Sequence, residues 1–401
     1  MAHNKTMFSA TKIRLYPTPE QEEIFAKAFG CARWLWNNGL AETQKVYQET
    51  GKGLNQFALN NRIPELKKEF PWLSETHSQV LQSVNLNMSR AFINFFERRA
   101  KYPNFKSKHG KQSIQYPQSV KVGAGEIQLP KIGKVQAVVH RDIVGTIRTV
   151  TVSKTTTGKY FASVLTETGV AAPEVSFDGK ILGIDVGLMH LAVTSDGAKF
   201  DNPRHLLRAA KNLKCKQHML SRKTRGSKTR NKARILVAKA HEKTANARKD
   251  YLHKLSHRLV NENQVLAVED LHVKGMMKNH CLAKAIGDVG WSMLSGFIEY
   301  KAARAGKGFI KVNRFFPSSK SCSCCMHAQA KMPLAIRSWR CDQCGAQHDR
   351  DINAAINIRA EAQRMIAAGI AGTANRGTVS QGIGRKPCVL AGAVEVGSLV
   401  R

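Results

Sequence analysis

The chain has 401 residues, with 63 Lys and Arg against 29 Asp and Glu, so its formal net charge is +34 and its pI is about 10.1. This length predicts two or three compact units, and the basic excess argues against an ordinary metabolic enzyme and for a protein that binds a polyanion. The sequence has no run of about 18 apolar residues and no apolar signal-peptide core at its start, which favours nucleic acid over a membrane.

The first predicted elements are a strand over residues 9–15 and a helix that follows it. Thr18, Pro19 and Gln21 supply the cap hydroxyl, the first-turn proline and the capping-box side chain of that helix. Apolar residues then recur at helical spacing towards Tyr47, which predicts one long amphipathic helix.

Two further helical patterns cover residues 56–70, with a break near Pro64, and residues 76–100. Between residues 114 and 168 the pattern changes to short β-branched runs separated by Gly and Lys, which predict a small antiparallel sheet or barrel. We expect the first strand to complete that barrel, so that the helices form a module inserted into it.

A second unit follows. The sequences KILGIDVG, from residue 180, and QVLAVED, from residue 264, predict two buried strands, and the turn Asp196-Gly197 predicts a hairpin after the first. Residues 204–258 form a long basic helical stretch between these strands. The tail over residues 366–401 is rich in Gly, Ala and Val without periodicity, and we expect it to be disordered.

Three acidic residues stand out by position: Asp185 and Glu269 near the ends of the buried strands, and Asp351 at the start of a helix. A carboxylate beside a hydrophobic strand needs a partner that offsets its desolvation. Two Mg²⁺ ions about 4 Å apart are such a partner and suit phosphodiester hydrolysis, although each acid alone is equally compatible with a helix cap or a turn. Spacing does not choose between Asp351 and Asp349, whereas Asp270 should face away from Glu269.

The cysteines indicate a metal site in a reducing compartment rather than a disulfide framework, because their number is nine and five of them fall in one short stretch. Two C-x-x-C pairs match the spacing of a closed four-thiolate zinc site, formed by Cys322, Cys325, Cys341 and Cys344. We interpret Cys324 as a spare thiol. His327 and His348 are possible substitute ligands, but we expect them at the surface or against a phosphate.

Basic residues run from Arg204 to Lys239 with no acid until Glu242. A solvated helix face normally alternates charge, so this run favours a nucleic-acid channel whose contacts with phosphates carry little sequence information. The residues of this run that we expect to contact nucleic acid are Arg222, Lys223, Arg225, Lys228, Arg230 and Lys232.

The stretches KIRLYPTPEQ, FGCARWLWN, GIDVGLMHLAV, VEDLHVKGM, FFPSSKSCSCC and WRCDQCGAQHDRDINAAINI are spread over nearly all of residues 12–358. In this combination the chain resembles the TnpB family of transposon-encoded RNA-guided DNA nucleases, relatives of the type V CRISPR effectors. The resemblance implies Asp185, Glu269 and Asp351 as the catalytic acids, which decides against Asp349. One departure is Met326, which follows Cys325 where the family usually has Gly.

The implied fold is a multi-domain combination of α/β and β architecture. It comprises an RNase H-like (RuvC) nuclease core with an inserted zinc ribbon, and an N-terminal wedge-type β-barrel with an inserted helical recognition module. The implied boundaries are 1–17 and 112–175 for the barrel, 18–111 for the helical module, 176–313 and 346–365 for the nuclease core with its basic helices, 314–345 for the ribbon, and 366–401 for the tail.

The resemblance implies a guide RNA from the transposon end and cleavage of double-stranded target DNA beside a short adjacent motif, in the cytoplasm of a prokaryote, at the nucleoid. It also implies two catalytic Mg²⁺ ions and one structural Zn²⁺. Gln79 and Gln82 are candidates to contact the motif, and Lys274, Lys278 and Arg350 to orient the scissile phosphate.

Three alternatives remain at this point. A nuclease-silent RNA-guided repressor of the same build is disfavoured because all three carboxylates are present. A transposase or a nuclease that works without a guide has no need of a long basic channel for a large RNA. A zinc-ribbon protein that only binds RNA leaves the acids at the strand ends unexplained.

Overall fold

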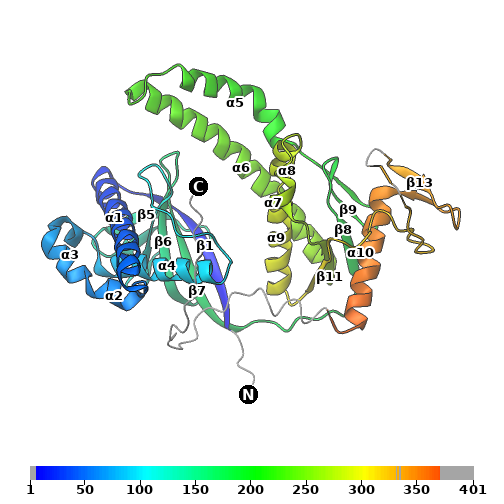
Figure 1. The fold of residues 1–401 in the computed structure, drawn as a ribbon, viewed down its shortest axis with the longest axis horizontal. Coiled ribbons are helices and arrows are strands. Elements are labelled where there is room, and N and C mark those ends of the chain that lie inside the picture. Colours follow the sequence, from blue (N-terminus) through cyan, green and yellow to red (C-terminus); the bar gives the residue numbers. More distant parts are fainter. Residues whose placement is uncertain (1–5, 331, 334–335, 371–401) are drawn as a thin grey trace. The chain divides into compact units, whose positions relative to one another are not determined.

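The computed structural model describes residues 6–330, 332–333 and 336–370 of the chain (Figure 1). It divides into two compact units. The first comprises the residues up to Pro173 together with His205–Ala247, and the second comprises Glu174–Arg204 and the residues from Arg248 onwards. Among the described residues, none of the helices combines the length and the hydropathy that a membrane crossing requires.

A seven-stranded sheet forms the base of the first unit, in the order β2-β6-β7-β1-β5-β4-β3. Its strands are β1 (Thr6–Tyr16), β2 (Gln112–Tyr116), β3 (Lys121–Val122), β4 (Glu126–Leu129), β5 (Gly133–Val138), β6 (Thr146–Lys154) and β7 (Tyr160–Ala171). The first strand β1 lies between β7 and β5 and is antiparallel to both, so it does join the later strands. The described pairings leave β2 and β3 as edges and do not close the sheet into the predicted barrel.

The helices inserted between β1 and β2 are α1 (Pro19–Thr50), α2 (Gln56–Asn61), α3 (Ile63–Glu69), the 3-10 helix η1 (Pro71–Glu75) and α4 (Ser78–Phe96). Helix α1 begins with the predicted capping box, in which Thr18 and Gln21 each accept a hydrogen bond from the other's backbone N–H. The predicted helix over 56–70 is two helices, because the chain breaks at Arg62 and Pro64 then lies in the first turn of α3.

The second unit contains a five-stranded sheet in the order β10-β9-β8-β11-β12. Its strands are β8 (Ile181–Asp185), β9 (His190–Thr194), β10 (Lys199–Asp201), β11 (Val265–Glu269) and β12 (Gly308–Val312). Strands β8, β11 and β12 are parallel, whereas β9 and β10 continue the sheet as an antiparallel hairpin. Central parallel strands are covered on both faces, which explains why ILGI and VLAV lack polar alternation.

Helices supply that cover. They are the part of α6 (Lys228–Glu262) from Arg248 onwards, α7 (Val273–Met276), α8 (Ala283–Val289), α9 (Trp291–Arg304) and α10 (Arg350–Ala367). Helix α5 (His205–Ser221) and the start of α6 belong to the first unit. Leu255 of α6 and Leu294 of α9 pack in one core with Val268, on one face of the sheet. Ile358 of α10 packs with Ala267 in a second core on the other face. Figure 1 shows α9 in yellow and α10 in orange on opposite sides of this sheet.

The segment between β12 and α10 carries the cysteines and a short hairpin, β13 (Ser338–Arg340) with β14 (Gln347–Asp349). Helix α10 extends to Ala367, beyond the predicted end of the nuclease core at residue 365. The predicted disorder of the tail lies outside the described residues from residue 371 onwards.

Candidate active site, cysteine cluster and nucleic-acid surfaces

Two of the predicted acids end neighbouring parallel strands. Asp185 is the last residue of β8 and Glu269 is the last residue of β11, and the register pairs Ile184 with Val268 just before them. The carboxyl ends of parallel strands lie at the same edge of a sheet, which is where α/β folds place their ligands. The two side chains therefore start from adjacent positions on one edge.

Helix α10 brings the third acid to this edge because it packs directly on β8 at Gly183. A Cβ atom on Gly183 would lie 2.0 Å from the carbonyl oxygen of Ala355 and 2.7 Å from the backbone nitrogen of Arg359, so only glycine permits this approach. Asp351 is in the first turn of α10, one turn before Ala355. The absence of a side chain at Gly183 thus determines how closely α10, and with it Asp351, approaches β8 and Asp185.

The charges of Glu269 and Asp351 act on the carboxyl group of Asp185. Burial raises the pKa of Asp185 well above its ordinary value, and the negative charges of Glu269 and Asp351 raise it further, against the backbone N–H of Val186 and the charge of Arg350. Burial also raises the pKa of Glu269, opposed by a hydrogen bond from Ser318. Neighbouring acids that resist ionisation are typical of sites that bind a cation or transfer a proton.

The donor set fits Mg²⁺. Carboxylate oxygens are hard ligands, and a site made of three carboxylates would leave coordination positions for water and a phosphate oxygen. A bound divalent cation would also offset the two effects that raise the pKa of Asp185, which are burial and the negative charges of Glu269 and Asp351. We therefore treat Asp185, Glu269 and Asp351 as a candidate Mg²⁺ site.

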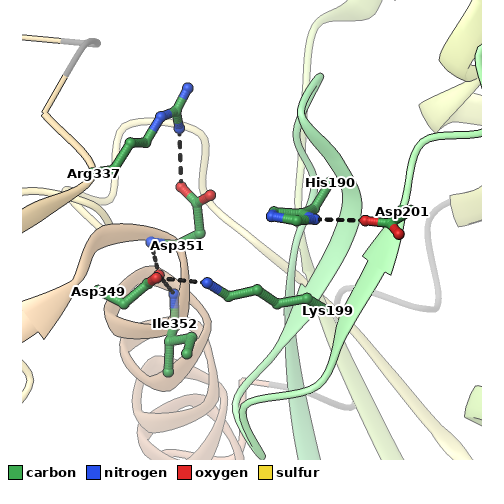
Figure 2. Close-up of polar contacts among 7 residues, drawn as sticks. All are labelled: His190, Lys199, Asp201, Arg337, Asp349, Asp351 and Ile352. Atoms are coloured by element: carbon green, nitrogen blue, oxygen red, sulfur yellow. Dashed lines mark hydrogen bonds and ion pairs between the residues drawn. The ribbon is translucent and has the colours of Figure 1, made fainter.

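Asp349 has a different task from Asp351, as Figure 2 shows. It is the N-cap of α10, and its Oδ1 accepts the backbone N–H groups of Asp351 and Ile352, both at 3.1 Å. Its Oδ2 pairs with Lys199 Nζ at 2.6 Å. Burial opposes ionisation of Asp349, but the bonds from Lys199 and Ile352 outweigh it and lower its pKa. Both carboxylate oxygens of Asp349 are thus engaged at the start of α10.

The carboxylate of Asp351 pairs with Arg337 Nη1 at 3.3 Å, a partner that the sequence did not suggest (Figure 2). Arg350, a candidate for phosphate orientation, is instead buried and donates to the carbonyl of Pro333 at 3.0 Å. The other two candidates, Lys274 and Lys278, are exposed on and just after α7.

Asp270, the neighbour of Glu269, forms an ion pair with Arg314 at 2.7 Å. Its carboxylate is about half exposed, with 47% of the side chain accessible. This partner is consistent with the expectation that Asp270 faces away from Glu269, since successive residues of a strand point to opposite faces.

The four predicted cysteines form one compact cluster. Their sulfur atoms all lie within 4.8 Å of one another, with Cys322–Cys344 and Cys325–Cys341 each 3.6 Å apart. This arrangement fits a tetrahedral four-thiolate Zn²⁺ site. Burial opposes ionisation of the Cys322 thiol, but the backbone N–H groups of Cys325 and Cys324 and nearby thiols outweigh it and lower its pKa to about 7. The donor chemistry is therefore suited to zinc.

Met326, the departure from the TnpB pattern, adopts φ = 62°, in the left-handed region. The equivalent residue of the second knuckle is Gly345, at φ = 72°. In both knuckles this residue's N–H bonds the carbonyl of the first cysteine at 2.9 Å, so both turns require the same backbone conformation. A methionine can adopt it only at a cost in strain.

The expectation that His348 lies at the surface is wrong. His348 is buried against Trp339, with ring centroids 4.8 Å apart, and its Nε2 lies 3.0 Å from Cys322 Sγ. With Cys322 and Cys324 it makes up a second possible group of metal ligands. His327 is partly exposed, and its carbonyl accepts the N–H of Cys322 at 2.9 Å.

Three buried polar residues that the sequence analysis did not single out connect the cysteine segment to the acids. The hydroxyl of Ser318 donates to Glu269 Oε1. Asn353 and Asn357 of α10, each 1% exposed, bond the backbone of residues 318–323. Their signal in the sequence was the spacing of four on the otherwise apolar face of INAAINI.

The basic residues expected to contact nucleic acid lie around the turn between α5 and α6. Arg222, Lys223, Arg225, Lys228 and Lys232 are exposed there. Arg230 is different, because its Nη1 donates to the carbonyls of Leu220 and Lys223 at 3.0 and 2.7 Å and so closes the turn. Its guanidinium is thus already engaged within the protein.

The two glutamines on α4 differ in their surroundings. Gln82 is exposed, whereas the amide oxygen of Gln79 is buried without a hydrogen-bond partner among the described residues. Beside them a cleft lies between α1, α4 and β2. Its polar lining consists of cations, amides and hydroxyls, with no acid among the described residues: Arg33, Ser83, Asn87, Lys106, Ser107, Lys111, Gln112, Ser113, Gln115 and Thr151.

The aromatic ring of Trp36 also lines this cleft, and Lys106 Nζ lies 3.6 Å from its centroid. Burial, with a smaller effect of the Lys111 charge, lowers the pKa of Lys106 to about 8. This combination of groups is suited to nucleotides: the cations can bind phosphates, and the aromatic ring and the amide groups can contact bases.

Three family models match the chain. "Helix-turn-helix domain" matches residues 7–52, "Probable transposase" of the IS605 OrfB type matches 150–280, and "Cas12f1-like, TNB domain" matches 291–358. In the first range the structure contains strand β1 and the single continuous helix α1. The third range spans the four cysteines and Asp351.

Known proteins resemble the chain over most of its length. "Putative RNA-guided DNA endonuclease" of Streptomyces pristinaespiralis is 38% identical over 373 residues, 91% of this chain and 90% of that protein. "Putative RNA-guided DNA endonuclease InsQ" of Escherichia coli K12 is 30% identical over 379 residues, covering 90% and 94%. The protein in the structure of a Cas12f1–sgRNA–target DNA complex shares the fold at a TM-score of 0.57 and 13% identity, over 88% of this chain and 99% of that chain.

Proposed function

Because the chain belongs to the TnpB (IS605 OrfB) family of transposon proteins, we propose that it is an RNA-guided DNA endonuclease that cuts double-stranded DNA beside a short adjacent motif. The observation that supports the catalytic part of the proposal is the position of the three acids: Asp185 and Glu269 end the neighbouring parallel strands β8 and β11, and Asp351 is in the first turn of α10, which packs on β8. Burial and the charges of Glu269 and Asp351 raise the pKa of Asp185. Such a group needs a divalent cation to be fully ionised.

The acids would hold two Mg²⁺ ions, which when bound supply an activated water and stabilise the leaving oxygen of the phosphodiester. The rest of the task falls to the protein. Asp349 accepts hydrogen bonds from Lys199 and from the backbone N–H of Asp351. These bonds fix the first turn of α10, so that the Asp351 side chain is available to the metal ions. Arg337 holds the Asp351 carboxylate, and exposed Lys274 and Lys278 are available to a phosphate.

The basic turn between α5 and α6 and the cleft between α1, α4 and β2 are the proposed contacts with nucleic acid. The exposed cations of the turn suit the backbone of a guide RNA, since charged contacts of this kind do not depend on sequence. The amides of the cleft suit base edges, and Gln82 near it remains a candidate for contacting the target-adjacent motif.

The first experiment is to express the chain with its flanking DNA and sequence the RNA that copurifies. A discrete structured RNA that ends in a short variable segment is expected, and this segment names the DNA target. A library of flanking sequences beside that target then identifies the motif by cleavage. Heterogeneous fragments, or cleavage that needs no RNA, would instead support a guide-free transposase or nuclease.

Catalysis is tested with Asp185→Ala. This variant should lose cleavage while it retains binding of the RNA and of the matched target, because Asp185 lies at a strand end and the proposed RNA contacts lie elsewhere. Cleavage by Asp185→Ala at the wild-type rate would refute the assignment of the metal site. Target binding without cleavage by the wild type would indicate the nuclease-silent repressor.

A further inference from the structure

Ser318 lies on the segment that leads from β12 to the cysteine cluster, and it is in contact with the candidate active site. Its side chain is 5% exposed, and its hydroxyl donates a hydrogen bond to Glu269 Oε1. This is a hydrogen bond between a neutral donor and a carboxylate, a strong class of hydrogen bond. It engages Oε1 and leaves Oε2 of Glu269 for other partners.

Helix α10 fixes the segment that carries Ser318. Asn357 Nδ2 donates to the carbonyl oxygens of Ser318 and Ser321, both at 2.7 Å. Asn353 Nδ2 donates to Ser321 at 2.7 Å, and its Oδ1 accepts the N–H of Ser323 at 2.9 Å. Residues four apart lie on one face of a helix, so both side-chain amides form hydrogen bonds with the same stretch of backbone.

Breaking these hydrogen bonds costs much free energy because both asparagines are 1% exposed. A buried amide or carbonyl that loses its partner retains its desolvation penalty without compensation. Residues 318–323 therefore have one preferred position relative to α10. The same helix carries Asp351, so the position of Ser318 is tied to that of the third acid.

We propose that Ser318 is a positioning residue for Glu269. Its hydroxyl fixes the carboxylate so that Oε2 is presented to a metal ion shared with Asp185 and Asp351, and Asn357 keeps the hydroxyl in place. This role rests on the proposed function, because the orientation of Glu269 matters only where the three acids bind a divalent cation. Residues that orient metal ligands commonly affect metal affinity as well as activity.

The test compares Ser318→Ala with Ser318→Thr, which keeps a hydroxyl, and with Ser319→Ala. Ser319 is the adjacent, half-buried serine and is not part of this hydrogen-bond network. Each chain is prepared as its complex with the copurifying RNA. Binding of Mn²⁺ is measured by electron paramagnetic resonance, and the signal of an Asp185→Ala complex is subtracted to remove ions bound by the RNA.

Ser318→Ala should weaken binding of Mn²⁺ at the carboxylates by about 10- to 100-fold and raise the Mg²⁺ concentration needed for cleavage in parallel. Ser318→Thr should restore much of the affinity, and Ser319→Ala should match the wild type. All complexes should bind target DNA equally.

Wild-type Mn²⁺ affinity in Ser318→Ala would overturn the positioning role, even if the variant melted at a lower temperature, because that pattern indicates a purely structural serine. A different failure marks the proposed function. If the wild-type complex shows neither Mn²⁺ binding that depends on Asp185 nor cleavage, the three acids are not a metal site and the role of Ser318 falls with it.

Discussion

Replacement of Gly183 by Ala should separate the acids without altering any of them. The added Cβ would lie 2.0 Å from the carbonyl oxygen of Ala355, and Cβ contacts under 3.0 Å essentially do not occur, so β8 and α10 must move apart by about 1 Å. The obstacle is helix backbone, which cannot rotate away as a side chain can. Overpacking of this kind costs about 1–3 kcal/mol of stability.

The effect on cleavage should exceed the effect on folding. Asp351 moves with α10, and a displacement of about 1 Å at a reacting centre can reduce the rate about 100-fold. The assay is single-turnover cleavage of a matched target at a temperature where the melting curve shows the variant to be folded. Target binding is measured in the same preparation and should stay unchanged.

Gly30→Ala serves as the control, because a Cβ on Gly30 meets nothing within 4 Å and the residue is inside helix α1. It should gain about 0.5–1 kcal/mol and cleave normally. Wild-type cleavage and melting by Gly183→Ala would refute the close packing of α10 on β8. Lower stability with an unchanged rate in the folded protein would show that the position of Asp351 does not depend on this contact.

Three further predictions concern single side chains. In a chelator at pH 7.5, Asp185→Asn should melt above the wild type, by about 1.4 kcal/mol for each unit by which folding raises the pKa of Asp185. Between the pKa of Asp185 in the unfolded chain, about 4, and its higher pKa in the folded protein, only the folded state keeps this carboxyl group protonated, so the stability of the wild type falls as the pH rises above about 4. The stability advantage of Asp185→Asn should therefore vanish at about pH 4. With Mg²⁺ bound, the wild type should be the more stable of the two. Met326→Gly should relieve left-handed strain and stabilise the zinc-loaded protein by about 1 kcal/mol in a thermal melt; no gain, with zinc content unchanged, would contradict the strain. RNA affinity should fall from pH 7 to pH 9 as Lys106, with its pKa of about 8, loses its charge, whereas Lys106→Arg should hold its affinity; equal pH profiles would exclude Lys106 from the interface.

The strand-end positions of Asp185 and Glu269 were predictable because each depends on a local pattern, whereas the local pattern did not distinguish Asp351 from Asp349. A run of apolar residues such as VLAV defines a buried strand, and an acid after it lies at the strand end whatever the strand order. The cysteine pairs were predictable for the same reason, since ligand spacing is local.

Contacts between distant segments could not be predicted in this way. The pairing of Arg337 with Asp351 joins the ribbon to a helix, and the bond from Ser318 to Glu269 spans 49 residues of sequence. Arg350 and Arg230 were expected at phosphates because they are basic, but carbonyl groups reached only in the folded chain engage them. Closure of the barrel likewise depends on whether the edge strands β2 and β3 pair with each other, and this cannot be predicted from local sequence patterns.

The order of the segments along the chain also matters during synthesis. Helix α10 covers one face of the five-stranded sheet and delivers Asp351, yet it is the last helix of the second unit to leave the ribosome among the described residues. A nascent chain that stalls within the cysteine segment therefore has Asp185 and Glu269 in place but lacks the third acid. It also exposes apolar residues such as Ala267 and Ile310, which α10 covers in the complete fold, and exposed apolar surface of this kind promotes aggregation. A chain truncated before α10 therefore lacks Asp351 and should not form the proposed metal site.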